Sequence, residues 1–236
     1  MVIGKKLLAA ALVLELCSGL ALAAEKAERA ERSDLPPKPI KTINLPEPKL
    51  IGKMTVEEAI FRRRSERSFL PNELSLEQIS QLLWSAQGIT DKTWGFRAAP
   101  SSGSLYPLTI YALKSDGIFR YVPDGHKLLQ TSAEDIRPSL VRASLGQDFI
   151  GQAPLVIVIV GNFRIVEAKF GQRSYRYLNM EIGHAAENIQ LQAVALGLVS
   201  VPVGAFWDDV VAKELALPDT QDPFYILPVG YLKSGS

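Results

Sequence analysis

The stretch PLVIVIV, at residues 154–160, is a continuous apolar run in which five of the seven residues are β-branched. A strand with one wet face alternates apolar and polar side chains, so an uninterrupted run predicts a central strand that is covered on both faces. Turn sequences at residues 115–117 and 123–125 predict a short meander before it. The other strands are predicted at residues 106–113, 117–122, 126–129, 198–203 and 225–229.

Helix signals lie on both sides of this run in the sequence. Thr55 with Glu58, and Ser75 with Gln78, have the spacing of capping boxes, and the second helix is expected to stop near Gly88. A short helix is expected around residues 139–145. Residues 174–196 have the spacing of one long buried helix that ends at Gly197. Strands and helices in mixed order, with helices on both faces of a sheet, predict an α+β fold.

Residues 1–24 have the features of a Sec-type signal peptide. Lys5 and Lys6 precede an apolar stretch, and small residues at 21–23 offer a cleavage point. The stretch is short for a membrane span and contains Glu15, so we expect a periplasmic or otherwise exported protein with no stable membrane insertion after cleavage. An anchor that is never cleaved remains the alternative. Cleavage would also remove Cys17, the only cysteine, which excludes disulfides and thiolate metal sites from the mature protein.

Residues 25–50 are charged and then rich in proline, which predicts an extended arm before a domain at residues 51–236. Removing residues 1–24 takes two lysines and one glutamate from the 26 basic and 25 acidic residues, which leaves the two kinds balanced. A nucleic-acid-binding protein normally has a basic excess, so nucleic acid is not expected as a partner.

Three motifs are candidates for a binding site. RRRSERSF, residues 62–69, places four arginines in six positions. Basic residues are common at helix ends, but guanidinium groups with serine hydroxyls are also what a phosphate or carboxylate requires. RAAPSSGSLYP, residues 97–107, is a loop of small residues that would let a flat polar ligand approach the backbone. VPVGAF, residues 201–206, could turn free N–H groups toward a ligand edge.

Metal chemistry is not expected. Glu181, His184 and Glu187 share one helical face and resemble half of a di-iron site, but no second ExxH sequence completes it. We therefore interpret His184 as a buried structural residue and Asn188 as a hydrogen-bonded polar group of the core or an interface.

The order and spacing of these motifs resemble the nitroreductase-like flavoprotein family, and the SagB/ThcOx-type dehydrogenase branch in particular. The resemblance runs from about residue 45 to residue 231 and also includes LPEP, QAPLVIVIVGN, YRYLNMEIGHAAENIQLQAVALGL and LPVGY. It implies a nitroreductase-like fold with a mixed or antiparallel central sheet flanked by helices. It also implies FMN as the cofactor and a homodimer with the long helix at the interface.

The resemblance assigns site residues by position. The arginine motif would hold the phosphate, ribityl and pyrimidine side of FMN, through Arg63, Arg64, Ser65 and Arg67. The loop would cover the flavin across the subunit boundary, through Pro100, Ser101, Ser102 and Ser104. The backbone N–H groups at Gly204 and Ala205 would approach flavin N5, and Lys233 would complete the phosphate clamp.

Azoline-oxidising relatives use a Lys-Tyr pair on the segment that matches residues 175–177. Arg176 stands at the lysine position here, which disfavours azoline oxidation and leaves Tyr177 as the catalytic candidate. The leading hypothesis is an FMN-dependent oxidoreductase that exchanges hydride through flavin N5 with a small-molecule substrate. The alternative is a non-catalytic dimeric binding protein of the same fold that uses the arginines for a phosphorylated or carboxylated ligand.

Overall fold

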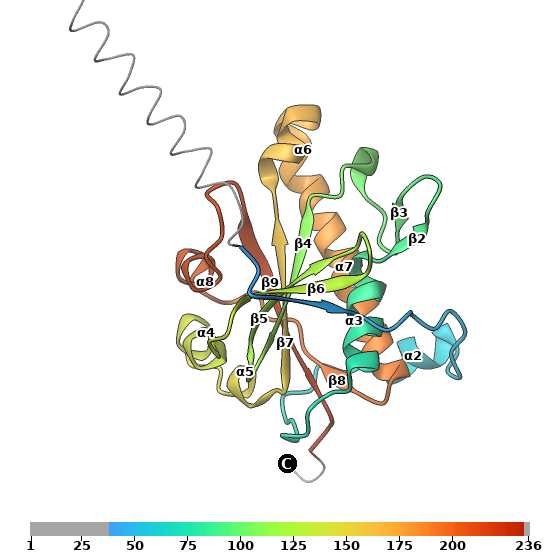
Figure 1. Cartoon of the computed structure of the whole chain (residues 1–236), viewed down its shortest axis with the longest axis vertical. Coiled ribbons are helices and arrows are strands. Elements are labelled where there is room, and N and C mark those ends of the chain that lie inside the picture. The colour runs from blue at the N-terminus through green and yellow to red at the C-terminus, as the bar shows by residue number, and fades with distance from the viewer. Residues whose placement is uncertain (1–37, 234–236) are drawn as a thin grey trace, which may run out of the picture. The chain divides into compact units, whose positions relative to one another are not determined.

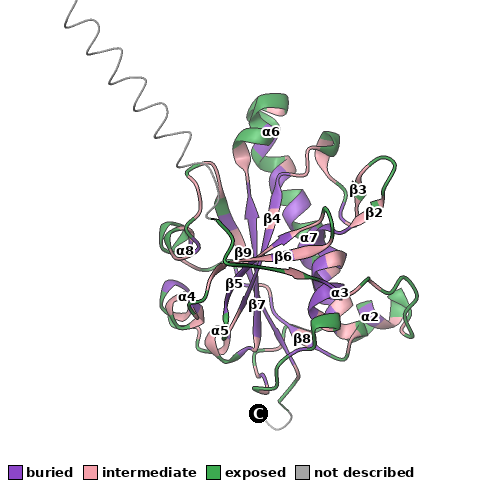
Figure 2. Cartoon of the chain, in the orientation of Figure 1, coloured by how far each residue is buried: buried purple, intermediate pink, exposed green. Residues whose placement is uncertain are grey.

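The computed structural model describes residues 38–233, so the predicted signal peptide and the first part of the predicted arm lie outside the described residues. The apolar run forms β7 (Leu155–Gly161), and all seven of its residues are buried (Figure 1, Figure 2). Within the described residues, β7 is an interior strand of a seven-stranded sheet with the order β1-β6-β5-β4-β7-β9-β8. The other strands of the sheet are β1 (Lys41–Asn44), β4 (Leu108–Lys114), β5 (Gly117–Val122), β6 (Lys127–Ser132), β8 (Val199–Ser200) and β9 (Asp222–Gly230).

All neighbouring strands of this sheet run antiparallel. The adjacency of β4, β5 and β6 confirms the predicted meander. A separate hairpin consists of β2 (Ile89–Asp91) and β3 (Phe96–Arg97). The remaining elements are the helices α2 (Val56–Arg62), α3 (Leu76–Gln87), α4 (Arg137–Ala143), α5 (Phe149–Gln152), α6 (Phe163–Phe170), α7 (Ser174–Ala195) and α8 (Asp208–Glu214), with the 3-10 turns η1 (Ser102–Ser104) and η2 (Gly171–Arg173).

Helices cover both faces of the sheet, which explains why β7 has no polar residue. Leu155, Ile157 and Ile159 join the apolar cluster that contains residues of α3 and α7. The intervening valines of β7 join a second cluster with residues of α4, α5 and α8. Figure 1 shows these two groups of helices on opposite sides of the strands. Alternate side chains of an extended strand point to opposite faces, so each face of β7 must be apolar.

Part of the segment predicted as an arm belongs to the sheet. β1 lies at the sheet edge and pairs with β6, with Ile43 opposite Leu128. The prolines at positions 39 and 46 flank this strand and leave its own N–H groups intact. Proline is compatible with the ends of an edge strand, so a proline-rich segment can still contribute one.

The long helix is confirmed as α7, and Gly197 after it has a left-handed φ of 72°. The prediction that His184 is buried was wrong, because His184 is exposed in this chain. The buried stripe of α7 includes Leu178, Ile182 and Ile189. His184 falls on the opposite side, because residues that share a helical face are three or four positions apart. Two apolar side chains of α7, Tyr175 and Met180, are also exposed.

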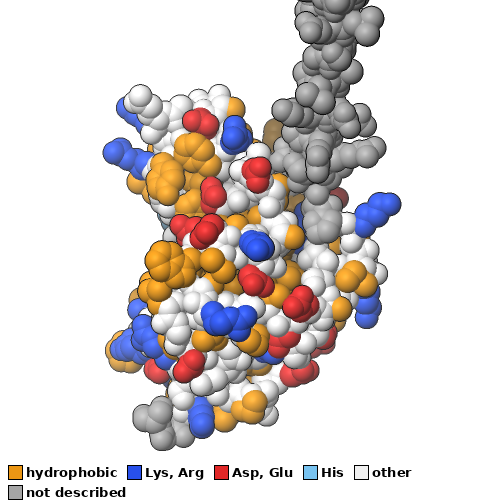
Figure 3. All heavy atoms as spheres, turned by 90° about the vertical axis from the view of Figure 1, so that its left-hand side faces the viewer, with side chains coloured by type: hydrophobic (Ala, Val, Ile, Leu, Met, Phe, Trp, Pro, Cys, Tyr) orange, Lys and Arg blue, Asp and Glu red, His pale blue; other side chains and the backbone are white. Residues whose placement is uncertain are grey.

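Figure 3 shows the face seen from the side of α4, α5 and α8, where acidic and basic side chains are interspersed with apolar ones. In the part of the chain from residue 38 to residue 233, no helix has the length and apolar character that a membrane crossing requires.

Candidate functional site

The arginine segment, residues 62–69, begins at the last residue of α2 and then runs as non-helical backbone beside the end of the sheet. On one side Ser65 forms a parallel bridge with Ser200, and the Glu66 N–H donates to the Ser200 carbonyl at 3.2 Å. On the other side the Lys233 N–H donates to the Ser68 carbonyl at 3.1 Å. Phe69 is 4% exposed and anchors the segment in the core. The fold therefore places Lys233 beside the arginine segment and fixes the backbone that carries the arginines.

The arginine side chains have different surroundings. The Arg63 guanidinium lies 3.7 Å from the Glu187 carboxylate of α7, and both groups are partly exposed. Arg64 donates to the carbonyl of Phe61 at 2.9 Å, at the C-terminal end of α2. The Arg67 guanidinium lies 5.8 Å from the centre of the Phe149 ring. Within residues 38–233, neither Arg64 nor Arg67 forms an ion pair with a carboxylate. Their charges are available to an external anion.

The serine loop, residues 100–106, has an unusual backbone. Gly103, Ser104 and Tyr106 have φ values of 63°, 55° and 49°. Such left-handed conformations are uncommon for residues other than glycine, and they persist only where neighbouring groups hold them. The Ser101 hydroxyl bridges the turn, since it accepts from the Tyr106 N–H at 2.8 Å and donates to Glu181 Oε2 at 2.7 Å. Pro100 and Ser104 are exposed, and Ser102 is partly buried.

Beneath the serine loop lies a polar group of residues that we call the Glu181 cluster, made of Gln87, Arg97, Ser101 and Glu181. Arg97 donates to Gln87 Oε1 at 2.9 Å, and its guanidinium lies 4.5 Å from the centre of the Tyr106 ring. Glu181 Oε1 and Gln87 Nε2 are buried without a hydrogen-bond partner in the described part of the chain. Burial raises the pKa of Glu181 to about 7, against the lowering effects of Ser101, the Ser102 backbone and Arg97.

The sequence interpretation of Glu181 as part of a metal-like pattern did not anticipate this cluster. The signal was present, because Glu181 interrupts the apolar stripe of α7 between Leu178 and Ile182. A carboxyl group at a core-facing helical position calls for a donor from another element. Asn188 is confirmed as such a hydrogen-bonded polar group, since its amide donates to the Ser85 carbonyl at 3.0 Å.

Gly204 and Ala205 form an exposed turn that follows Val203, whose N–H donates to the Ile226 carbonyl at 2.8 Å. The Ala205 carbonyl accepts from the Gln147 side chain at 3.2 Å. Among residues 38–233, the N–H groups of Gly204 and Ala205 have no hydrogen-bond acceptor. They are thus open to an acceptor atom of a ligand.

Tyr177 is half-buried, and its ring packs edge-on against Phe170 with 4.9 Å between the ring centres. Phe170 in turn borders the serine loop, because a side chain at Gly103 would lie 3.2 Å from its ring. Tyr177 precedes Glu181 by one turn of α7, so both lie on the side of the helix next to the loop.

Helix α7 connects the two groups of predicted residues. Glu181 contacts the serine loop and Glu187 contacts Arg63. These two residues of α7 are six positions apart, which corresponds to about 9 Å along the helix axis.

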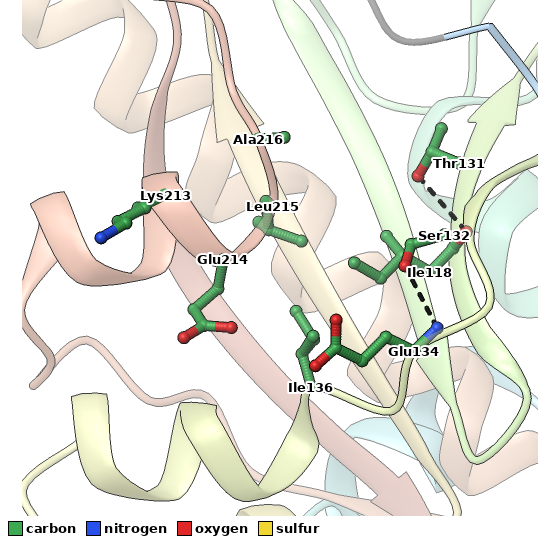
Figure 4. A pocket seen from close by; sticks show the side chains of 9 residues that line it. All are labelled: Ile118, Thr131, Ser132, Glu134, Ile136, Lys213, Glu214, Leu215 and Ala216. Carbon is green, nitrogen blue, oxygen red and sulfur yellow. Dashed lines mark hydrogen bonds between the residues drawn. The ribbon is translucent and has the colours of Figure 1, made fainter.

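Two cavities of the described chain lie elsewhere. One of about 270 Å³ is lined by residues of β5, β6 and α8, with Glu134 and Glu214 at its edge (Figure 4). The other, of about 820 Å³, is bordered by residues 49–56, α2, α3 and α7. No predicted site residue lines either of these two cavities.

Comparison with known proteins relates this arrangement to one family. The model of the nitroreductase family matches residues 60–231. Protein MJ1384 of Methanocaldococcus jannaschii, which is named for that family, is 36% identical over 194 residues, which cover 80% of this chain and 95% of that protein. The microcin B17-processing protein McbC of Escherichia coli is 28% identical over 158 residues, which cover 62% of this chain and 58% of McbC.

A solved structure shares the fold. The crystal structure of a nitroreductase-type protein from Ralstonia eutropha JMP134 superposes with a TM-score of 0.76 at 30% identity, covering 85% of this chain and 96% of that one. The family match spans most of the chain, and the structural match covers most of both chains. The chain therefore belongs to the nitroreductase family, and its relatives include proteins of the SagB-type dehydrogenase branch.

Proposed function

We propose that the protein is an FMN-dependent oxidoreductase that exchanges hydride with a small-molecule substrate through flavin N5. The observation that carries this proposal is the arginine segment, whose backbone is paired on both sides while Arg64 and Arg67 have no carboxylate partner within residues 38–233. A phosphate is the ligand that such groups bind best, because charge-assisted hydrogen bonds to guanidinium are strong and directional.

The other predicted residues fit the remaining parts of FMN. Lys233 lies beside Ser68 and adds a positive charge to the phosphate end, and Ser65 offers a hydroxyl. The free N–H groups of Gly204 and Ala205 are suited to acceptor atoms along the edge of a flavin ring. When bound, FMN supplies the hydride chemistry, while the protein orients the ring and the substrate and excludes water. The Tyr177 hydroxyl is the candidate group to hold a proton at the substrate.

A homodimer would complete the site. Members of the family are commonly dimeric. In the single chain the apolar side chains of Val56, Ile60 and Phe61 on α2 are exposed, as are Tyr175 and Met180 on α7. Exposed apolar side chains on neighbouring elements are typical of a protein interface. We propose that these helices meet those of a second copy, whose serine loop, through Pro100, Ser101, Ser102 and Ser104, then covers the flavin.

Export remains part of the proposal through the signal-like residues 1–24. Nicotinamide cofactors are scarce outside the cytoplasm, so the electrons would come from another donor. Mass spectrometry of the protein recovered from the periplasmic fraction tests this point. A mature chain that begins near residue 25 supports export, and a full-length chain recovered from the cytoplasm contradicts it.

Purification discriminates the enzyme from the alternative, a dimeric binding protein that uses the same arginines for a phosphorylated or carboxylated ligand. A yellow protein that releases FMN on denaturation, and whose bound flavin is reduced and reoxidised reversibly under anaerobic conditions, supports the oxidoreductase. A colourless protein that takes up no added FMN, yet binds a simple organic phosphate through Arg64 and Arg67, supports the binding protein.

A further inference from the structure

Glu181 is a buried acid to which the proposed function gives no role. Glu181 is 3% exposed, and the Ser101 hydroxyl donates to its Oε2 at 2.7 Å. Oε1 has no hydrogen-bond partner in residues 38–233. An ionised carboxylate is unfavourable in such a place, because it loses its hydration while its Oε1 gains no donor within residues 38–233.

The Ser101 contact connects this acid to the conformation of the serine loop. The same hydroxyl accepts from the Tyr106 N–H at 2.8 Å, so it ties the end of the loop to α7. Between these positions Gly103, Ser104 and Tyr106 have left-handed backbones. Loosening the Ser101 contact would therefore free the part of the loop that needs external restraint most.

The charged side chains near Glu181 do not replace the missing donor. Arg97 of β3 lowers the pKa of Glu181 electrostatically, but its guanidinium is hydrogen-bonded to Gln87 of α3. Lys169 of α6 donates to the Gly103 carbonyl at 3.3 Å, which places its charge on the loop. Burial is the largest influence, and it raises the pKa of Glu181 to about 7.

The other elements packed against α7 add little charge at this point. Strands β7 and β8 contain no titratable residue, and Asp222 of β9 is exposed and close enough to Asp208 to act on it. On α7 itself His184 is exposed on the far side, and Glu187 is paired with Arg63 at the end of α2. The protonation of Glu181 is thus set mainly by its burial, to which the serine loop contributes through the Ser101 contact.

We propose that Glu181 is a positioning residue for the serine loop, and that its protonated carboxyl group keeps the loop closed against α7. In the ionised form Oε1 requires a donor, and water can supply one only if the loop lifts. The consequence for FMN rests on the proposed function, in which this loop covers the flavin.

The size of the effect follows from the difference between the covered and the uncovered acid. With a pKa of about 7 when covered and about 4.5 when open to water, the ratio of closed to open loop falls about 30-fold between pH 5.5 and pH 8.5. The loop is therefore most closed in mild acid and loosens through neutral pH.

Hydrogen exchange of the loop amides tests this without any cofactor. In the full chain, protection of the Tyr106 amide and its neighbours, corrected for the intrinsic exchange rate, should fall about 30-fold between those two pH values. In Glu181→Gln, which stays neutral and keeps an acceptor oxygen, protection should be high and independent of pH. Glu167→Gln, the same change at an exposed residue of α6, is the matched control and should behave as the wild type.

Two results would overturn the proposal: loop protection in the wild type that does not change with pH, or a change that persists in Glu181→Gln. Ser101→Ala provides a second variant that leaves the helix intact. It should lower loop protection at both pH values and remove most of the pH dependence, because the acid is then disconnected from the loop.

An FMN-binding titration, with quenching of flavin fluorescence as the readout, separates this inference from the proposed function. If the wild type binds FMN, its affinity should weaken with rising pH more than that of Glu181→Gln. Equal pH dependence in the two proteins overturns the connection between the loop and the cofactor. If neither protein binds FMN, the proposed function fails, while the exchange experiment still decides whether Glu181 positions the loop.

Discussion

Replacing Glu181 by glutamine should change the pH dependence of the free energy of unfolding. The pKa of Glu181 rises from 4.5 to about 7 in the fold, because burial of the carboxyl group outweighs the lowering by Ser101, the Ser102 backbone and Arg97. The folded state therefore holds a proton that the unfolded state releases. The stability is fully present below about pH 4.5 and is lost as pH rises through about 7. Glutamine does not titrate, so the variant should lack this loss.

The magnitude follows from the same two pKa values. Each pH unit between them corresponds to about 1.36 kcal/mol, so full ionisation costs about 3 kcal/mol. About 2 kcal/mol of this falls between pH 5.5 and pH 8.5, because the acid is already mostly ionised in the unfolded chain at the lower value. Relative to the wild type, Glu181→Gln should therefore gain about 2 kcal/mol across that interval.

Urea unfolding of both proteins at the two pH values measures this gain directly, with the slope of the transition as a check that the unfolded state is unchanged. Glu167→Gln serves again as the control, since its carboxyl group is exposed and should give no pH-dependent difference. A constant difference between Glu181→Gln and the wild type at both pH values would refute the reasoning, because it would show that Glu181 has the same pKa in the folded and unfolded chain.

Three further predictions follow from other parts of the structure. The Nδ1 of His126 lies 2.8 Å from the Tyr121 hydroxyl, and its Nε2 lies 2.6 Å from Ser80 Oγ. Burial lowers the pKa of His126 in the folded chain. The contribution of His126 to the free energy of unfolding is therefore present above about pH 6.5 and is lost as pH falls below that value. His126→Asn, which tolerates the φ of 43° at this position, should flatten that acid limb in urea unfolding between pH 7 and pH 5. Arg64→Ala should weaken FMN retention by roughly 1.5 to 3 kcal/mol in equilibrium dialysis, whereas the exposed Arg164→Ala should not, and equal affinities would contradict the assignment. Ile157→Ala should lower the free energy of unfolding by about 2 to 5 kcal/mol, because the fully buried side chain on β7 leaves a cavity, and a loss under about 1 kcal/mol would mean that the strand is not the centre of the core.

The elements that depend on local pattern were predictable from the sequence. β7 follows from an apolar run with no polar interruption, and α3 follows from Ser75 and Gln78, which form both bonds of the capping box. Of the capping box predicted at the start of α2, one hydrogen bond is present, because the Thr55 side chain accepts from the Glu58 N–H. The Glu58 side chain pairs with Arg62 instead of returning to the Thr55 backbone. A charged partner one turn away competes with the helix end for the same carboxylate.

Features that depend on which face of an element packs could not be predicted. The exposure of His184 and the burial of Glu181 are decided by the orientation of α7 against the sheet. Sequence periodicity shows which residues share a face of a helix, but it does not show which face packs against the sheet. The surroundings of the individual arginines could not be predicted for the same reason. Arg62 and Arg63 pair with different acids, on α2 and on α7, whereas neither Arg64 nor Arg67 pairs with an acid among residues 38–233. The path of the backbone beside Ser200 determines these surroundings.

Helix α7 acts as one rigid element that reaches from the serine loop at Glu181 to the arginine end at Glu187, and it carries the exposed side chain of Met180. A straight helix cannot shorten, so a tilt of α7 moves the contact of Glu181 with Ser101 and the contact of Glu187 with Arg63 together. Substitutions at Met180 that change how its exposed side chain is covered would thus act on the neighbouring Glu181 and on Glu187 about two turns away. They would change the binding of a phosphate by the arginine segment and the position of the serine loop at the same time.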